Sequence, residues 1–161
     1  MEDDSRPAWT DPTCPVARAT DFVGDRWSLL IIRDAMDGAR TFTEFHQRTG
    51  IARNMLTDRL RRLTTYGLLA QVDAPRGKRK QYELTPNGED LFPVILALRS
   101  WGERHAFAHG EPHSTLVDVS GGRVSAPIPL GSDGARLTSR NTRVVKAVPD
   151  GGVSPEGPRE P

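Results

Sequence analysis

The sequence predicts a mainly α-helical domain that carries one β-hairpin, an α+β fold. Apolar residues recur at helical spacing in several segments between residues 14 and 109, and two stretches rich in strand formers flank a turn at residues 74–79. The composition changes from Gly110 onward, and 161 residues suffice for one domain with additional segments. We therefore expect a flexible arm over residues 1–13, a helical domain over 14–109, a small β-rich appendage over 110–147 and a disordered tail over 148–161.

The overall composition is that of a soluble protein, with 36% hydrophobic and 27% charged residues. No apolar run approaches the roughly 20 residues that a membrane helix needs, and no apolar segment of a signal peptide follows the acidic start at residues 1–4. The single cysteine excludes an intrachain disulfide, which agrees with a reducing compartment. We expect a cytoplasmic protein that does not bind membranes.

The N-terminal part of the domain predicts two helices. The first begins at residues 13–15, because proline suits the first helical position, and Gly24 ends it. Asp25 caps the second helix, which ends at Gly38. The expected apolar stripes consist of Val16, Ala19, Phe22 and Val23 in the first helix and of Trp27, Leu30, Ile31 and Ala35 in the second.

A third helix is expected to begin at a capping box. In this motif Thr41 and Glu44 each satisfy an exposed backbone N–H, and two phenylalanines, Phe42 and Phe45, follow on the inner side. The helix should end at Gly50, and the short turn 50–52 then leads directly into a fourth helix.

The fourth helix, expected over residues 53–66 and ended by Gly67, has one apolar and one polar face. Leu56, Leu60 and Leu63 recur at i, i+4 and i+7, so this face should be buried. The opposite face carries donors that can reach phosphates or base edges. It consists of Asn54, Asp58 and Arg61, flanked by Thr57 and Arg62.

A β-hairpin with a basic tip is expected after this helix, with strands over residues 68–73 and 80–85. The formal net charge of the chain is only +1, yet bases far outnumber acids between Arg53 and Lys80. Such a local basic patch on a helix and an adjoining loop is typical of nucleic-acid binding. The bases are Arg53, Arg59, Arg61, Arg62, Arg76, Lys78, Arg79 and Lys80, and the acids are Asp58 and Asp73.

The last helix of the domain should begin with Thr85 as cap and Pro86 at the first position, and Pro93 should bend it. Its apolar residues between Leu91 and Trp101 cover more than one face, which requires burial on two sides. We expect a second subunit on the outer side, in a two-fold dimer built from the first and last helices. Short strands with glycine turns are expected beyond it, at residues 116–119 and 141–145.

Together, the helices, the hairpin and its basic tip resemble a winged helix-turn-helix, and specifically the HxlR-type regulators. The resemblance is carried by GIARNMLTDRLRRLTTYGLL, by QYELTPNGEDL, and by the segments 14–16, 23–27 and 41–45, and it extends over roughly 90 residues to Trp101. It implies a homodimeric transcriptional regulator, a repressor, that binds double-stranded DNA at a pseudo-palindromic operator. Relatives usually have a serine, a capping residue, at the position of Ala52 or of Arg53 in this chain. The start of the fourth helix therefore lacks a serine cap.

The two basic elements are assigned different parts of the DNA contact. From the fourth helix we expect base or near-base contacts by Arg53, Asn54, Thr57 and Arg61. Phosphate contacts are expected from Arg62 and, on the wing, from Arg76, Lys78 and Arg79. Asp58 either pairs with Arg61 or Arg62 or accepts from a cytosine amine.

Cys14 has two interpretations. A thiol at a helix N-terminus can be activated as a nucleophile, and the family resemblance implies sensing of oxidants or electrophiles by a cysteine at this place. The other interpretation is a capping or buried residue. Any effector, small molecule or oxidant, stays unidentified.

Three other functions are alternatives to DNA binding. His105, His109 and His113 recur every four residues, but Gly110 interrupts the helix, so we expect no metal site and read the first two as favourable at a helix C-terminus. No catalytic motif or cofactor-binding loop is present, so we expect no enzyme and no cofactor. The alternative function is a winged helix that binds protein or RNA without specific DNA binding.

Overall fold

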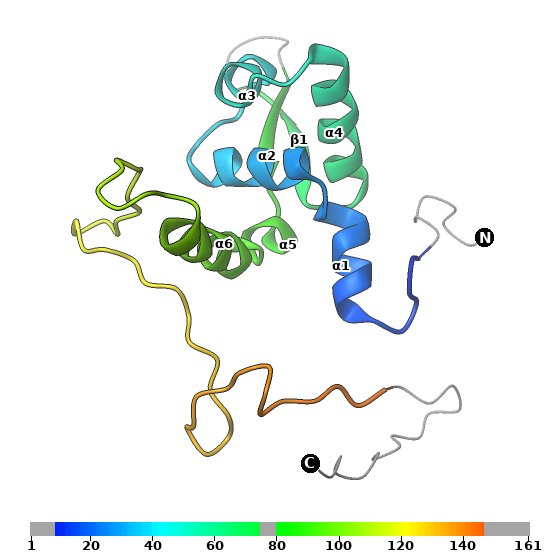
Figure 1. Ribbon diagram of the computed structural model, residues 1–161. Coiled ribbons are helices and arrows are strands. Elements are labelled where there is room, and N and C mark those ends of the chain that lie inside the picture. The colour runs from blue at the N-terminus through cyan, green and yellow to red at the C-terminus, as the bar shows by residue number, and fades with distance from the viewer. Residues whose placement is uncertain (1–8, 75–79, 147–161) are drawn as a thin grey trace.

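The computed structural model describes residues 9–74 and 80–146 (Figure 1). Within these ranges the chain is mainly helical and contains a single two-stranded antiparallel sheet, as expected from the sequence. Among the described residues, no helix is both long and apolar enough to cross a membrane. The elements are α1 (Pro15–Val23), α2 (Arg26–Met36), α3 (Phe42–Thr49), α4 (Arg53–Thr65), β1 (Leu69–Asp73), β2 (Lys80–Leu84), α5 (Pro86–Glu89) and α6 (Phe92–His105).

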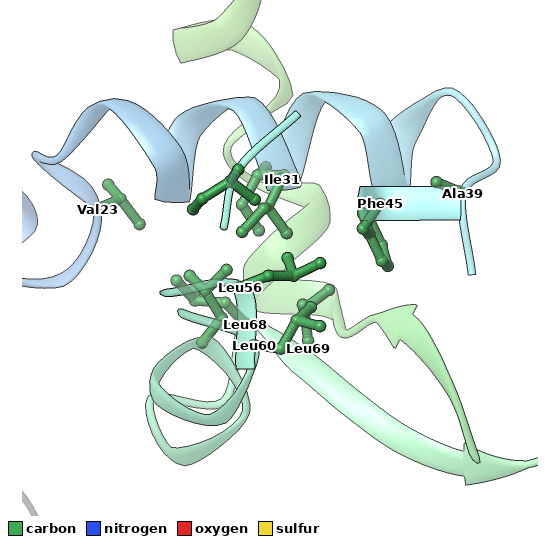
Figure 2. Close-up of a cluster of buried hydrophobic side chains, with 11 residues drawn as sticks. Val23, Ile31, Ala39, Phe45, Leu56, Leu60, Leu68 and Leu69 are labelled. Atoms are coloured by element: carbon green, nitrogen blue, oxygen red, sulfur yellow. The ribbon is translucent and has the colours of Figure 1, made fainter. Parts of the chain in front are cut away.

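One hydrophobic core joins α2, α3, α4 and the hairpin (Figure 2). The three leucines predicted for the inner face of α4, Leu56, Leu60 and Leu63, are all 0% exposed. They pack in a cluster with Ile31 of α2 and Phe45 of α3. Burial of side chains of this size stabilises the fold by about 1.5–3 kcal/mol each, so this core fixes how α4 lies on the domain.

Helix α2 turns most of the predicted stripe to the core: Ile31 belongs to the buried cluster, Trp27 and Ala35 pack against it, and Leu30 is the exception. Ile31 and Ile32 are fully buried, whereas Leu30 lies outside the central cluster in a groove shared with α6. The stripe was wrong at Leu30 because α2 packs on two sides, against α3 and α4 on one and against α6 on the other.

The predicted helix boundaries between residues 25 and 50 are confirmed. Asp25 caps α2 by accepting hydrogen bonds from two backbone N–H groups, and the capping box of Thr41 and Glu44 is complete at the start of α3. Gly50 ends α3 in the left-handed conformation, with φ of 66°. A side chain is strained in that conformation, so glycine allows the sharp turn into α4.

The hairpin pairs in register from Leu69 opposite Leu84 to Asp73 opposite Lys80. It is tied to the helices, because the backbone N–H of Tyr82 donates to the carbonyl of Arg40 at 2.7 Å. The strands agree with the prediction, whereas the turn residues 75–79 lie outside the described ranges.

The predicted last helix is in fact two helices. Thr85 caps α5 and Pro86 lies in its first turn, as expected, but α5 ends at Glu89 and α6 begins at Phe92. Pro93 was expected to bend one continuous helix and instead lies in the first turn of the second. Proline has no N–H, and the first turn is the place where a helix does not need one.

Residues 9–13, expected to belong to a flexible arm, lie on the chain's own α1. The ring of Trp9 contacts Phe22 at 5.3 Å between centroids, and the guanidinium of Arg18 lies over Trp9 at 4.7 Å. Thr10 donates two hydrogen bonds to Asp21. The aromatic side chain holds this segment because it covers apolar surface that α1 leaves open.

No strand forms in residues 110–146, contrary to the β-rich appendage expected there. This segment contains two isolated β-bridges, Val117 with Arg123 and Leu130 with Arg136, and none at residues 141–145. Most of its side chains are exposed. An alternating apolar pattern stabilises a sheet only when one face is covered, and none of the other described residues covers this one. The tail at 148–161 lies outside the described residues.

Candidate nucleic-acid interface

Helices α3 and α4 and the turn between them form a helix-turn-helix whose second helix presents a polar face. Ile51 anchors the turn in the core with 2% of its surface exposed. Ala52 is the N-cap of α4, and its side chain makes no capping hydrogen bond. The predicted lack of a capping serine is therefore a real feature, and the N-cap side chain satisfies none of the first backbone N–H groups of α4.

The candidate base-contacting residues of α4 lie together on its exposed face. Arg53, Asn54, Thr57 and Arg61 are all exposed. Arg53 is positioned by Phe42 of α3, because its guanidinium lies over that ring at 5.3 Å from the centroid. The hydroxyl of Thr57 donates to the carbonyl of Arg53 at 2.9 Å. This face therefore presents several donors to a groove-sized partner.

Arg62 lies at the edge of this face and is only half exposed. Its guanidinium lies 5.8 Å from the ring centroid of Tyr66. Such a position at the side of a helix suits contact with a backbone phosphate better than contact with a base edge.

Asp58 is paired with two arginines of its own helix. Its carboxylate accepts from Arg61 at 2.7 Å and from Arg59 at 2.8 Å. The hydrogen bond from Arg61 holds the pKa of Asp58 below its ordinary value, against partial desolvation, and the positive charges of Arg61 and Arg59 act in the same direction. Of the options left open by the sequence, pairing with Arg61 is the one found. This exposed pair is weak enough for Arg61 to exchange Asp58 for a DNA group.

Arg59, counted in the basic stretch of the sequence without a predicted contact of its own, is largely covered and binds another helix. Its Nε donates to Asp25 at 3.0 Å, which joins α4 to the N-cap of α2. Partial burial is the largest influence on the pKa of Asp25 and raises it, but hydrogen bonds from Ser28 and the charge of Arg59 together lower it. Arg59 therefore orients α4 on the domain.

The described part of the wing carries its charges in pairs. Lys80 lies 2.6 Å from Asp73 across the strand pair, and Arg40 forms an ion pair with Glu83 of β2. The predicted phosphate contacts Arg76, Lys78 and Arg79 belong to the turn outside the described residues. The ends of β1 and β2 that adjoin these residues lie on the side of α3 (Figure 1).

Two features of this surface were not predicted from the sequence. Met55 is 41% exposed on α4 beside Asn54, where an apolar side chain can contact a thymine methyl group. The signal was available, since Met55 falls outside the leucine stripe. The backbone of Arg40 links the wing to the loop before α3, and no local pattern indicates such a distant contact.

The remaining candidate residues lie away from this surface. Cys14 is the half-buried N-cap of α1, and its Sγ accepts from the N–H of Ala17 at 3.4 Å. His105 contacts Trp101, and His113 contacts Phe107, with ring centroids 5.1 and 4.9 Å apart. In the part of the chain that the structure describes, no three side chains of metal-binding type come together.

A helix-turn-helix followed by a hairpin wing defines a DNA-binding regulator of the winged helix-turn-helix class. The model of the HxlR-like helix-turn-helix family matches residues 22–109. The regulator Rv3095 of Mycobacterium tuberculosis (strain ATCC 25618 / H37Rv), an uncharacterized HTH-type transcriptional regulator, is 35% identical over 128 residues, which cover 78% of this chain and 81% of the relative. The chain belongs to the HxlR-like family and is a transcriptional regulator, not an enzyme.

Solved structures support the same assignment. The crystal structure of PA1607 matches with a TM-score of 0.79 at 43% identity, over 83% of this chain and 95% of that one. The redox regulator HypR in its reduced form matches with a TM-score of 0.54 at 29% identity, over 58% of this chain and 94% of HypR. The match to PA1607 thus extends over much more of the chain than the match to HypR.

Proposed function

We propose that the protein is a homodimeric, sequence-specific repressor that places one α4 in each of two successive major grooves. The observation that carries this proposal is the exposed donor face of α4, held rigidly by a buried leucine stripe and by the Arg59–Asp25 bridge. Two symmetric helices require half-sites about one helical turn apart, ~34 to 36 Å, or a multiple of it. The protein acts in the cytoplasm, where bacterial DNA lies.

Within this proposal Arg61 reads a base and Arg62 binds a phosphate. Arg61 has a side chain that is 73% exposed and can exchange Asp58 for a base edge, whereas Arg62 lies at the rim of the helix beside Tyr66. Arg53, Asn54 and Thr57 share the base-reading face, and the wing residues Arg76, Lys78 and Arg79 add phosphate contacts.

The division is tested by titrating operator DNA and mismatched operators with Arg61→Ala and Arg62→Ala. Arg61→Ala should lose about 1 to 3 kcal/mol at one base position and tolerate any base there. Arg62→Ala should weaken all sequences alike and reduce the salt slope by about one for each contact removed. Arg104→Ala, which removes the same charge from α6, serves as control. If both α4 variants lost affinity in the same way, the assignment would be wrong.

The dimer is proposed to form through α1 and α6. Val16 of α1 and Val94, Leu98 and Trp101 of α6 are between 46% and 71% exposed in the single chain. Apolar side chains exposed on the surface of helices are typical of a subunit interface. Light scattering should give twice the chain mass at micromolar concentration, and a monomer would overturn the dimer.

We further propose that Cys14 makes DNA binding sensitive to oxidants or electrophiles. It is the N-cap of α1, a helix of the proposed interface, and the solved relative HypR is a redox regulator. With one cysteine in each chain, oxidation gives an intersubunit disulfide or a small-molecule adduct. Diamide should change operator affinity in the wild type and leave Cys14→Ser unaffected. Equal responses of the two proteins would exclude this role.

The second candidate is a winged helix that binds protein or RNA. The observation that favours it is Met55, an exposed apolar side chain on the face assigned to DNA. Met55→Gln should leave most of the duplex affinity in place if DNA is the partner, because the donors around it remain. A protein or RNA module would show no preference among DNA duplexes before or after the change.

A further inference from the structure

The exposed large apolar side chains of the described residues are not spread evenly over the molecule. Apart from Met55 on α4, those of the folded body lie on α1 or on α6 and just beyond it. All the others belong to residues 115–146, which we call the C-terminal arm. The arm carries Val117, Val119, Ile128, Leu130, Val144 and Val145, of which Val119 is fully exposed and Val144 is 89% exposed.

The arm has defined local structure. The Asp118 carboxylate accepts hydrogen bonds from Ser120 and from the N–H of Gly122, which close a turn inside the bridge of Val117 with Arg123. Asp133 accepts from the N–H of Ala135 in a second turn, inside the bridge of Leu130 with Arg136. A third turn is closed by the side chain of Asn141, which accepts from Thr138 and donates to the carbonyl of Arg136. The arm is therefore a chain of preformed turns that hold its apolar side chains in place.

The arm leaves the body at one end and returns near it at the other. Arg99 of α6 donates to the carbonyl of Ser114 at 2.9 Å, just before the arm begins. At its far end, Lys146 adds its positive charge to the hydrogen bonds from Thr13 that lower the pKa of Asp11, close to the start of α1. Figure 1 shows the arm passing below α6 and on toward α1. It thus runs on the side of the body where the two helices with exposed apolar side chains lie (Figure 1).

The position of the arm argues against DNA as the covering partner. The arm does carry more bases than acids, but it runs on the side of the body away from the start of α4 and from the wing (Figure 1). The phosphate backbone of DNA would bind the Lys and Arg side chains of the arm, but it would leave Val119 and Val144 exposed to water. A partner with an apolar surface is required.

We propose that the C-terminal arm of each chain packs on α1 and α6 of a second copy of this chain. The inference rests on the proposed homodimer and adds to it that each arm packs on the other subunit. A second copy covers both exposed apolar surfaces, because two-fold symmetry places α1 and α6 of one subunit against the arm of the other. No other partner is needed to cover both surfaces at once.

The comparison with PA1607 supports a structural role for the arm. Residues outside 110–146 make up less than 83% of the chain, so the match to that crystal structure extends into this region. Part of this region is thus common to the two structures.

Photo-crosslinking tests the proposal on the full-length protein. p-Benzoylphenylalanine is placed at Val119 or at Val144, in a mixture of isotopically light and heavy chains. The proposal predicts crosslinks between light and heavy chains that map to α1 or α6. Ser132 is the control position, an exposed polar residue of the same arm. Crosslinks only within one chain, or only to added operator DNA, would overturn it.

Light scattering on the same samples separates the two proposals. A dimer without crosslinks between chains agrees with the homodimer and excludes packing of the arm on the other subunit. A monomer excludes both proposals. A second variant, Val119→Asp with Val144→Asp, should raise the dimer dissociation constant by ~10-fold or more, because two apolar contacts are lost at each arm. The matched charge change, Ser132→Asp with Ser139→Asp, should alter it less than ~3-fold. Equal effects of the two pairs would overturn the proposal.

Discussion

Replacing Ala52 by serine should stabilise the protein, because α4 begins without a capping side chain. Ala52 has φ of −57° and ψ of 140°, an extended conformation from which a serine hydroxyl can reach the second or third N–H of the helix. Replacing alanine by a good cap is worth about 0.5–2 kcal/mol. One of the two N–H groups, that of Met55, already donates to the Asn54 side chain at 2.9 Å. We therefore expect the lower half of the range, about 0.5–1 kcal/mol.

Urea unfolding measures this gain directly. The midpoint should rise at an unchanged slope, and the melting temperature should rise by roughly 2–8 °C for a domain of this size. Ala52→Thr and Ala52→Val form a matched pair of equal shape in which only the hydroxyl differs, and only the threonine variant should gain stability. If valine stabilised as much as threonine, or if serine destabilised the protein, Ala52 would not be the cap of α4.

Three further predictions concern the fold that holds α4. Leu60→Ala should cost about 2–5 kcal/mol in urea unfolding, because the side chain is fully buried; a loss below about 1 kcal/mol would place Leu60 outside the core. Gly88→Ala should destabilise by about 1–3 kcal/mol, since a Cβ would lie 2.2 Å from the Leu68 carbonyl oxygen, whereas Gly102→Ala in α6 meets open space and should be neutral or stabilising; the same sign for both would contradict this packing. Asp25→Asn should lower the stability of the protein at pH 7 and make that stability fall less in acid. The pKa of Asp25 is lowered in the folded protein, so the carboxylate contributes fully above the unfolded pKa of about 3.9. This contribution is lost as the pH falls through the folded pKa. Parallel stability curves of the wild type and Asp25→Asn between pH 7 and 2 would exclude this contribution.

The helices around the site were predictable because their signals are local. The leucines of α4 repeat at helical spacing, and the cap residues of α2 and α3 act within three positions of their own helix. Gly50 supplies the left-handed turn that only glycine adopts readily. These interactions depend on a few neighbouring residues, so the sequence contains all that they need.

The features that were not predicted correctly depend on contacts between residues that are distant in the sequence. Arg59 was counted in the basic stretch between Arg53 and Lys80 with no role of its own, and its bond to Asp25, 34 positions away, could not be predicted. Pro93 fits both a bend and a new start, and only the packing of α6 on α2 decides between them. The strands expected beyond Gly110 need a covering surface, which residues 9–74 and 80–146 of the single chain do not supply. Trp9 likewise folds back because α1 leaves Phe22 within reach.

The central claim is that the exposed face of α4 reads DNA sequence. The most direct test is fluorescence anisotropy of the reduced protein with DNA from upstream of its own gene, against a scrambled duplex, across a salt series. A helix α4 that reads sequence should give a preference of ~10³ or more for the upstream DNA together with a steep salt slope. Equal, weak binding to both duplexes at every salt concentration would contradict it and would favour the protein- or RNA-binding module.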